Sequence, residues 1–105
     1  MRIAEVTAVY PDHPDHSLAA WRQHFWQIVV RIEADSGDIG YGYGGGGVAA
    51  VEVVNRHFRE LLGGRSVESA EEIAEIWDDL YAASLPYGRK GLAVMALSGV
   101  DLALW

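Results

Sequence analysis

The sequence contains no cysteine, only three prolines, and eight basic residues against fifteen acidic ones. Without cysteine the chain can form no disulfide framework, no thiolate zinc site and no cysteine nucleophile. The formal net charge of −7 argues against nucleic acid as a partner, because such partners need a basic face. The basic residues are scattered along the chain, so they form no polybasic patch for a membrane surface.

Long hydrophobic runs are also absent. The most apolar segment, residues 88–105, is interrupted by Ser98 and Asp101 and is shorter than the roughly 20 residues that cross a bilayer. The N-terminus has one arginine and no long apolar stretch, so it does not resemble a secretory signal. We therefore expect a cytoplasmic protein with no membrane contact.

What the chain does have is 50% hydrophobic residues, enough for one domain with a core over 105 residues. Alternating patterns predict strands at 3–10, 26–34 and 39–43. The sequence "DSGD" at 35–38 predicts the turn of a hairpin between the second and third strands. The alternating apolar positions are Ala4, Val6, Ala8 and Tyr10, then Trp26, Ile28, Val30, Ile32 and Ala34, then Ile39, Tyr41 and Tyr43.

The second half of the chain has helical spacing instead. A first helix is predicted from Val51, Val54, Phe58 and Leu61, ending at Gly63 and Gly64. A capping box at Ser69 and Glu72 predicts the start of a second helix, whose apolar stripe continues until Pro86 ends it. The last helix is predicted to begin at Gly88. Strands and helices in separate blocks predict an α+β fold, a three-stranded antiparallel meander sheet followed by a bundle of about three helices.

The last helix is apolar around nearly its whole circumference, which is typical of a helix buried on all sides. Three strands and two helices would cover about half of it, and the remainder would form an exposed apolar patch of the kind found at interfaces. Asp101 lies inside this helix, so we expect a structural ion pair, with Arg89 or with a group outside this chain. We expect Trp105 to be either a cut point or part of a surface that meets another chain.

Two motifs resemble known ligand-binding patterns, one for dinucleotides and one for metal ions. Gly42, Gly44 and Gly47 spell G-x-G-x-x-G, but a dinucleotide fingerprint needs a following parallel strand that ends in an acidic residue, and here helix follows helix. This predicts a strand-to-helix loop. The segment "DHPDH" holds metal-type ligands, yet a loop with two prolines does not present them on one face. A solvated loop and a substrate-facing loop both remain open, and we find no catalytic set.

Three segments resemble a known family: "VVRIEADSGDIGYGYG", "IWDDLYAASLPYGRKG" and "AVMALSGVDLALW". Together they resemble the N-terminal capping domain of the enolase superfamily, in the mandelate racemase/muconate lactonizing group that includes acid-sugar dehydratases. The resemblance covers essentially all 105 residues. The last segment matches the family pattern A-x-S-G/A-x-D-x-A-L-W at Ala96, Ser98, Gly99, Asp101, Ala103, Leu104 and Trp105.

The resemblance implies that residues 1–105 form a single capping domain, with the sheet and lid loops in 1–46 and helices in 47–105, and that a catalytic barrel domain would follow. Family members bind Mg²⁺ through barrel carboxylates and abstract a proton α to the substrate carboxylate. None of those residues maps onto this sequence, so the chain itself is expected to hold no catalytic residue, no metal and no cofactor, and to be inactive alone.

What can be carried over from the family is the lid. Two loops, residues 11–24 and 43–48, would close over the barrel mouth and contact the distal end of a small carboxylate substrate. Their imidazole, carboxylate and phenol groups suit a polyhydroxy acid. The candidate contacts are His13, Asp15, His16, Trp21 and Tyr43. Tyr43 departs from the family, because many relatives have an acidic residue there.

The sequence also allows a second interpretation, and a homo-oligomer is expected in either case. In the second, the chain is a stand-alone interaction domain that oligomerises through its apolar C-terminal helix. The two interpretations differ in what covers that helix: a barrel of the same chain, or another copy.

Overall fold

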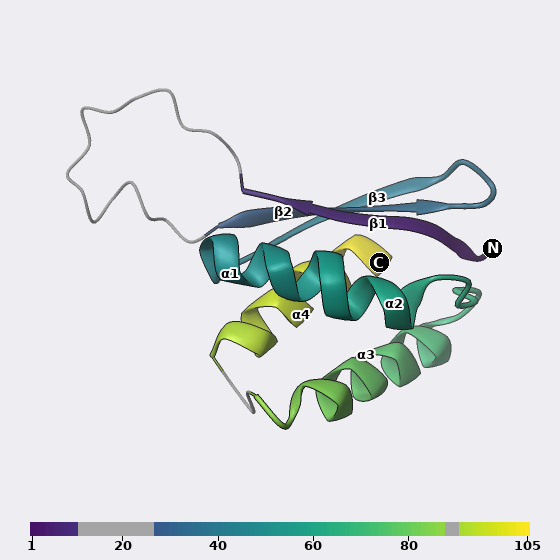
Figure 1. The fold of residues 1–105 in the computed structure, drawn as a ribbon. Coiled ribbons are helices and arrows are strands. Elements are labelled where there is room, and N and C mark those ends of the chain that lie inside the picture. Colours follow the sequence, from purple (N-terminus) through teal and green to yellow (C-terminus); the bar gives the residue numbers. More distant parts are fainter. Residues whose placement is uncertain (11–26, 88–90) are drawn as a thin grey trace.

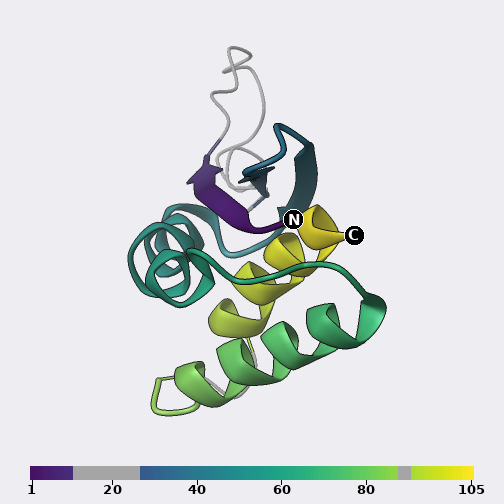
Figure 2. The ribbon, with the colours of Figure 1, turned by 90° about the vertical axis from the view of Figure 1, so that its right-hand side faces the viewer.

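The computed structural model describes residues 1–10, 27–87 and 91–105. It shows a three-stranded antiparallel sheet lying on a layer of helices, with one further helix beneath (Figures 1 and 2). The strands are β1 (Ile3–Val9), β2 (Ile28–Ala34) and β3 (Ile39–Gly44), in the order β1-β2-β3. The predicted meander is confirmed.

The helices follow the sheet in sequence. α1 (Gly47–Glu52), the π-helical segment η1 (Val53–Phe58) and α2 (Arg59–Leu62) run on as one continuous helix. After a connection come α3 (Ala70–Ser84) and α4 (Leu92–Leu104). The first helix and α4 pack side by side under the sheet, and α3 packs on α4 from below (Figure 2). The α+β prediction is therefore confirmed.

The β2–β3 hairpin has the turn that the sequence predicts. The amide of Gly37 donates to the carbonyl of Ala34 at 3.0 Å, and the amide of Ala34 donates to the carbonyl of Asp38 at 2.8 Å. Gly37 has φ of 93°, a left-handed conformation that glycine adopts without steric cost. This hairpin sets the register in which Val30 faces Gly42.

The first strand departs from the predicted alternation. Ile3 and Val6 are buried although they lie three residues apart, and Ala4 is exposed. The pairing with β2 shifts between Ile3 and Glu5, so one residue is inserted at this point. A bulge of this kind changes the phase of a strand, so Ala4 does not share a buried face with Val6 and Ala8 as the simple alternation indicates.

The first helix buries residues at a spacing of four: Ala50, Val54, Phe58 and Leu62. A regular α-helix has 3.6 residues per turn, so a spacing of four would drift around the helix. The wider π turns of η1 correct that drift and keep the four side chains on one face. Leu61, which the helical spacing groups with Val54 and Phe58, is therefore exposed, and Leu62 is buried instead.

The helix α3 begins as the capping box predicts. The hydroxyl of Ser69 accepts a hydrogen bond from the amide of Glu72 at 3.2 Å. The carboxylate of Glu72 accepts a hydrogen bond from the amide of Glu68 at 2.5 Å. That hydrogen bond is the main reason why the pKa of Glu72 lies below its usual value.

α4 lies between the sheet and α3. It begins at Leu92 rather than at Gly88, because Gly91 before it has φ of 78° and ψ of −127°, which is not helical. Its inner face, including Leu97 and Val100, is buried, whereas Met95, Leu102 and Trp105 are exposed. The predicted exposed apolar patch is therefore present. Asp101 is half-buried in α4, and Arg89, its proposed partner, lies outside the described residues.

Candidate functional site

The glycines of β3 bring the sheet into direct contact with α4. A Cβ on Gly40, Gly42 or Gly44 would lie 2.0, 2.2 or 2.4 Å from a main-chain carbonyl oxygen of α4. Those oxygens belong to Ala103, Gly99 and Met95, which lie four residues apart along one side of α4. The alternating glycines are therefore explained by close packing of a strand on a helix.

The glycine run continues past β3 to turn the chain into α1. Gly46 and Gly47 have φ of 96° and 60°, and both are buried. A Cβ on Gly46 would lie 2.6 Å from both the Ala50 Cβ and the Leu92 Cδ1. The run is thus packed against α1 and α4, and it forms the strand-to-helix loop that the sequence predicts.

Exposed side chains stand on both sides of this loop. Tyr43 is 64% exposed on the outer face of the sheet, and Val48 is 65% exposed on the first turn of α1. Val48 was predicted only as the boundary of the second lid loop, and its exposure on α1 carries no clear signal in the sequence. Together these two residues make segment 43–48 a surface that a ligand can reach.

The register of the sheet places this surface at the end where β1 finishes and β2 begins. Val9 pairs with Val29, and Val29 pairs with Tyr43, so these three residues form one row across the sheet. The connection from β1 to β2 therefore leaves and re-enters the sheet at the same end as segment 43–48. Four of the predicted contacts, His13, Asp15, His16 and Trp21, fall in that connection and lie outside the described residues.

The next row of the outer sheet face is polar. Thr7 pairs with Arg31, and Arg31 pairs with Tyr41. A hydrogen bond with the Tyr41 side chain is the main reason why the pKa of Arg31 is raised, and Glu33 at 3.2 Å adds an ion pair. This row keeps the guanidinium charged and held close to the sheet, next to the row that contains Tyr43.

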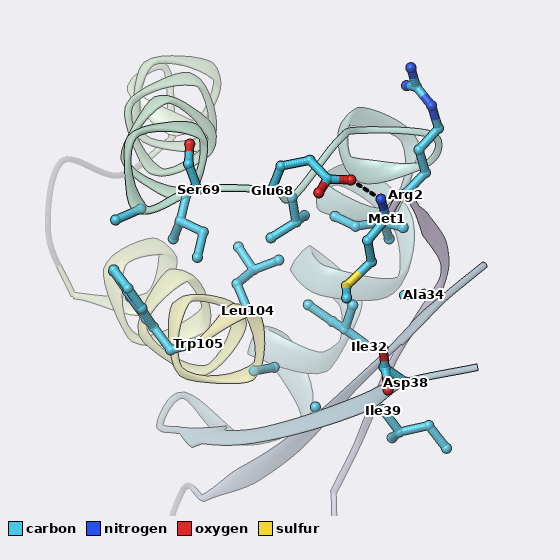
Figure 3. A pocket seen from close by; sticks show the side chains of 16 residues that line it. Met1, Arg2, Ile32, Ala34, Asp38, Ile39, Glu68, Ser69, Leu104 and Trp105 are labelled. Carbon is cyan, nitrogen blue, oxygen red and sulfur yellow. Dashed lines mark hydrogen bonds and ion pairs between the residues drawn. The ribbon is translucent and has the colours of Figure 1, made fainter. Parts of the chain in front are cut away.

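A cavity of about 390 Å³ lies at the opposite end of β3, where both ends of the chain meet (Figure 3). Its polar groups are engaged, since the Met1 amine pairs with Glu68 and the Ser69 hydroxyl caps α3. The Arg2 side chain points away from it (Figure 3). The lining residues are Met1, Arg2, Ile3, Ile32, Ala34, Asp38, Ile39, Gly40, Val67, Glu68, Ser69, Ala70, Ile73, Ala103, Leu104 and Trp105.

This cavity includes no residue of segment 43–48. Within residues 1–10, 27–87 and 91–105, no group of three or more His, Asp or Glu side chains is arranged to hold a metal. The donor set that Mg²⁺ needs is thus not formed by the described part of the chain. No helix in that part is long and apolar enough to cross a membrane.

No family model matches the chain. Comparison with individual known proteins finds relatives that match nearly all of it. The chain is 34% identical over 104 residues to a candidate L-rhamnonate dehydratase of Caldivirga maquilingensis, covering 98% of this chain and 25% of the relative. A mandelate racemase/muconate lactonizing protein of Paracoccus denitrificans, complexed with magnesium, superposes with a TM-score of 0.76 at 30% identity. That match covers 99% of this chain and 26% of the other. Nearly the whole chain is thus similar in sequence and fold to part of these proteins, as the resemblance to the N-terminal domain of the enolase superfamily predicts.

Further solved structures agree with this assignment. The 3,6-anhydro-D-galactonate cycloisomerase of Zobellia galactanivorans superposes with a TM-score of 0.78 at 26% identity. It matches 100% of this chain and 27% of its own. The chain therefore spans about a quarter of the length of these relatives, and its fold matches the N-terminal domain of the enolase superfamily.

Proposed function

We propose that residues 1–105 act as the capping domain of an enzyme that removes a proton α to the carboxylate of an acid sugar. In this role the domain covers the mouth of a catalytic barrel, excludes water and contacts the distal hydroxyl groups of the substrate. Mg²⁺ and the base belong to that barrel. The relatives' names, which include dehydratases and a cycloisomerase of sugar acids, support this substrate class.

The observation that carries the proposal is the row Val9–Val29–Tyr43. It brings the start and end of the 10–27 connection to the same end of the sheet as segment 43–48. Two loops from one end of a rigid sheet can close on one ligand, whereas loops at opposite ends cannot. His13, Asp15, His16, Trp21 and Tyr43 remain the proposed contacts.

Within segment 43–48 the roles differ. The Tyr43 phenol is exposed and can donate a hydrogen bond to a substrate hydroxyl or accept one from it. Val48, equally exposed, offers an apolar contact and restricts water. The buried glycines between them hold the two side chains at a fixed separation by packing on α4.

A transplant tests the role of Tyr43. Residues 1–105 replace the matching segment of the Gibberella zeae L-rhamnonate dehydratase, which is 29% identical to this chain. Tyr43→Phe should raise KM by about threefold to tenfold with little change in kcat, because one hydrogen bond to the bound substrate is lost.

Thr7→Ala, on the same face of the sheet but on the far strand, is the matched control and should leave KM unchanged. Equal KM values for the parent transplant and Tyr43→Phe, in protein with native circular dichroism, would remove Tyr43 from the substrate contacts.

An interaction domain is the second candidate, and one observation favours it. α4 exposes Met95, Leu102 and Trp105 along its outer side, with 45%, 47% and 71% of each residue accessible. An exposed apolar stripe of this kind is typical of a surface that packs against another protein element.

A further inference from the structure

Asn55 joins the first helix to the end of β1. Its side chain accepts a hydrogen bond from the Ala8 amide at 2.8 Å and donates one to the Ala8 carbonyl at 2.9 Å. Ala8 is the last residue but one of β1, directly before the connection that holds four of the five proposed substrate contacts. The two hydrogen bonds therefore hold the strand close to the point where that connection leaves the sheet.

The orientation of the Asn55 side chain is itself fixed. Arg59, four residues further along the same helix, donates to the Asn55 Oδ1 at 3.4 Å and to the Val6 carbonyl at 2.9 Å. The oxygen of the Asn55 amide thus faces two donors, which leaves its Nδ2 to donate to Ala8. Neither a carboxylate nor an apolar side chain offers this pair of donor and acceptor.

The row of the sheet that contains Ala8 is held at its other edge as well. Ala8 pairs with Val30, and Val30 pairs with Gly42. Gly42 lies so close to α4 that a Cβ there would be 2.2 Å from a main-chain oxygen of that helix. The next row contains Tyr43, where the second proposed lid loop begins. The base of the two proposed lid loops is therefore fixed on the β1 side by Asn55 and on the β3 side by α4.

The helix that carries Asn55 also forms the end of segment 43–48. Its first residue is Gly47, and it continues without a break through α1 into the π-helical segment. Ala50 and Val54, which lie between Gly47 and Asn55, are fully buried, so this stretch is anchored in the core. The link from Asn55 to β1 therefore fixes the start of one loop relative to the end of the other.

Asn55 belongs to the π-helical segment Val53–Phe58. Such segments are rare and occur frequently at functional sites. Here the wider turns keep Val54 and Phe58 buried while Asn55 reaches the backbone of Ala8. The irregular turn and the asparagine thus serve the same contact, that of the helix with the end of β1.

We propose that Asn55 is a positioning residue for substrate binding, and that it acts by holding the end of β1 at a fixed place relative to segment 43–48. The two lid loops then approach the distal end of an acid sugar at a fixed separation, so the cost of ordering them on binding is small. Asn55 acts through Ala8 rather than by touching the substrate. This inference rests on the proposed capping function.

The transplant into the Gibberella zeae dehydratase tests this role through KM and kcat. Asn55→Ala should raise KM by about threefold to tenfold and leave kcat within about twofold, because the base and the metal of the barrel are unaffected. A merely structural role predicts the reverse, since partial unfolding would lower kcat and leave KM unchanged. Arg56→Ala, on the exposed side of the same helix, is the matched control and should change neither.

Asn55→Asp separates the hydrogen bonds from the volume of the side chain. Aspartate is nearly isosteric, keeps the acceptor for the Ala8 amide and can pair with Arg59, but it has no donor for the Ala8 carbonyl. KM should rise as for Asn55→Ala, while the urea midpoint stays closer to that of the parent transplant. A rise in KM without a loss of stability cannot come from unfolding.

The outcomes separate this role from the capping function. A higher KM for Tyr43→Phe together with an unchanged KM for Asn55→Ala would overturn the positioning role and leave the capping function intact. Unchanged KM values for both variants would overturn both. Amide hydrogen exchange of the 105-residue chain gives a separate measurement: Asn55→Ala should speed exchange of the Ala8 amide, and unchanged exchange would show that Asn55 does not hold β1.

Discussion

At the scale of single residues, glycine does two separate things in this chain. Gly37 adopts a left-handed conformation in the hairpin turn, and nothing lies within 4 Å of the position where its Cβ would be. Gly42 lacks space: a Cβ there would meet the Gly99 oxygen, the Ala103 nitrogen and the Leu102 Cβ, all closer than 3.0 Å. Main-chain atoms cannot rotate away as a flexible side chain can, so Gly42 is required by packing.

Gly42→Ala should therefore destabilise the domain by about 2 kcal/mol or more, because β3 and α4 must separate to admit the methyl group. Urea unfolding measures the change. Gly63→Ala is the matched control, since its Cβ would be 3.6 Å from the Arg59 oxygen, an ordinary van der Waals contact, and its φ of −55° suits alanine. A Gly42→Ala variant as stable as Gly63→Ala would contradict the close contact of strand and helix.

At the scale of elements, the π-helical segment links the first helix to the edge of β1. It keeps Val54 and Phe58 buried on one side of the helix while Asn55 reaches the Ala8 backbone. The asparagine side chain presents an N–H donor and a carbonyl acceptor to Ala8, the same pair that an adjacent strand would offer. Asn55 therefore takes the place of a fourth strand beside β1.

Asn55→Ala should cost about 1–3 kcal/mol in the free energy of unfolding, since it leaves the Ala8 amide and carbonyl without partners at a part-buried position. Arg56→Ala, one residue along on the exposed side of the same helix, should cost no more than about 0.5 kcal/mol. If the two substitutions had equal effects, Asn55 would have no role in covering the sheet edge.

The elements themselves were predictable because alternation and helical spacing are local properties of the sequence. Three features were not. The bulge that exposes Ala4 and the π turns that expose Leu61 change the phase of an element, and only packing against neighbours reveals them. The start of α4 at Leu92 depends on the conformation of Gly91. Among the predicted site residues, Tyr43 is exposed at the expected junction, whereas the other four lie outside the described residues.

At the scale of the whole molecule, the sheet has two distinct ends. Segment 43–48 and the boundaries of the 10–27 connection lie at one end, and the cavity formed by residues from both ends of the chain lies at the other. The exposed surface of segment 43–48 is therefore separate from the cavity, and a substitution of a residue that lines the cavity need not alter that surface.

A domain that selects the substrate for a catalytic barrel should change substrate preference when it is transplanted onto another barrel. The most direct test is the ratio of kcat/KM for two acid sugars that differ at the end distal to the carboxylate, measured for the transplant and for its unmodified parent dehydratase. We expect dehydration to remain Mg²⁺-dependent while the ratio changes by about tenfold or more, because the distal contacts come from this chain. A folded, active transplant with the ratio of the parent would contradict the capping role.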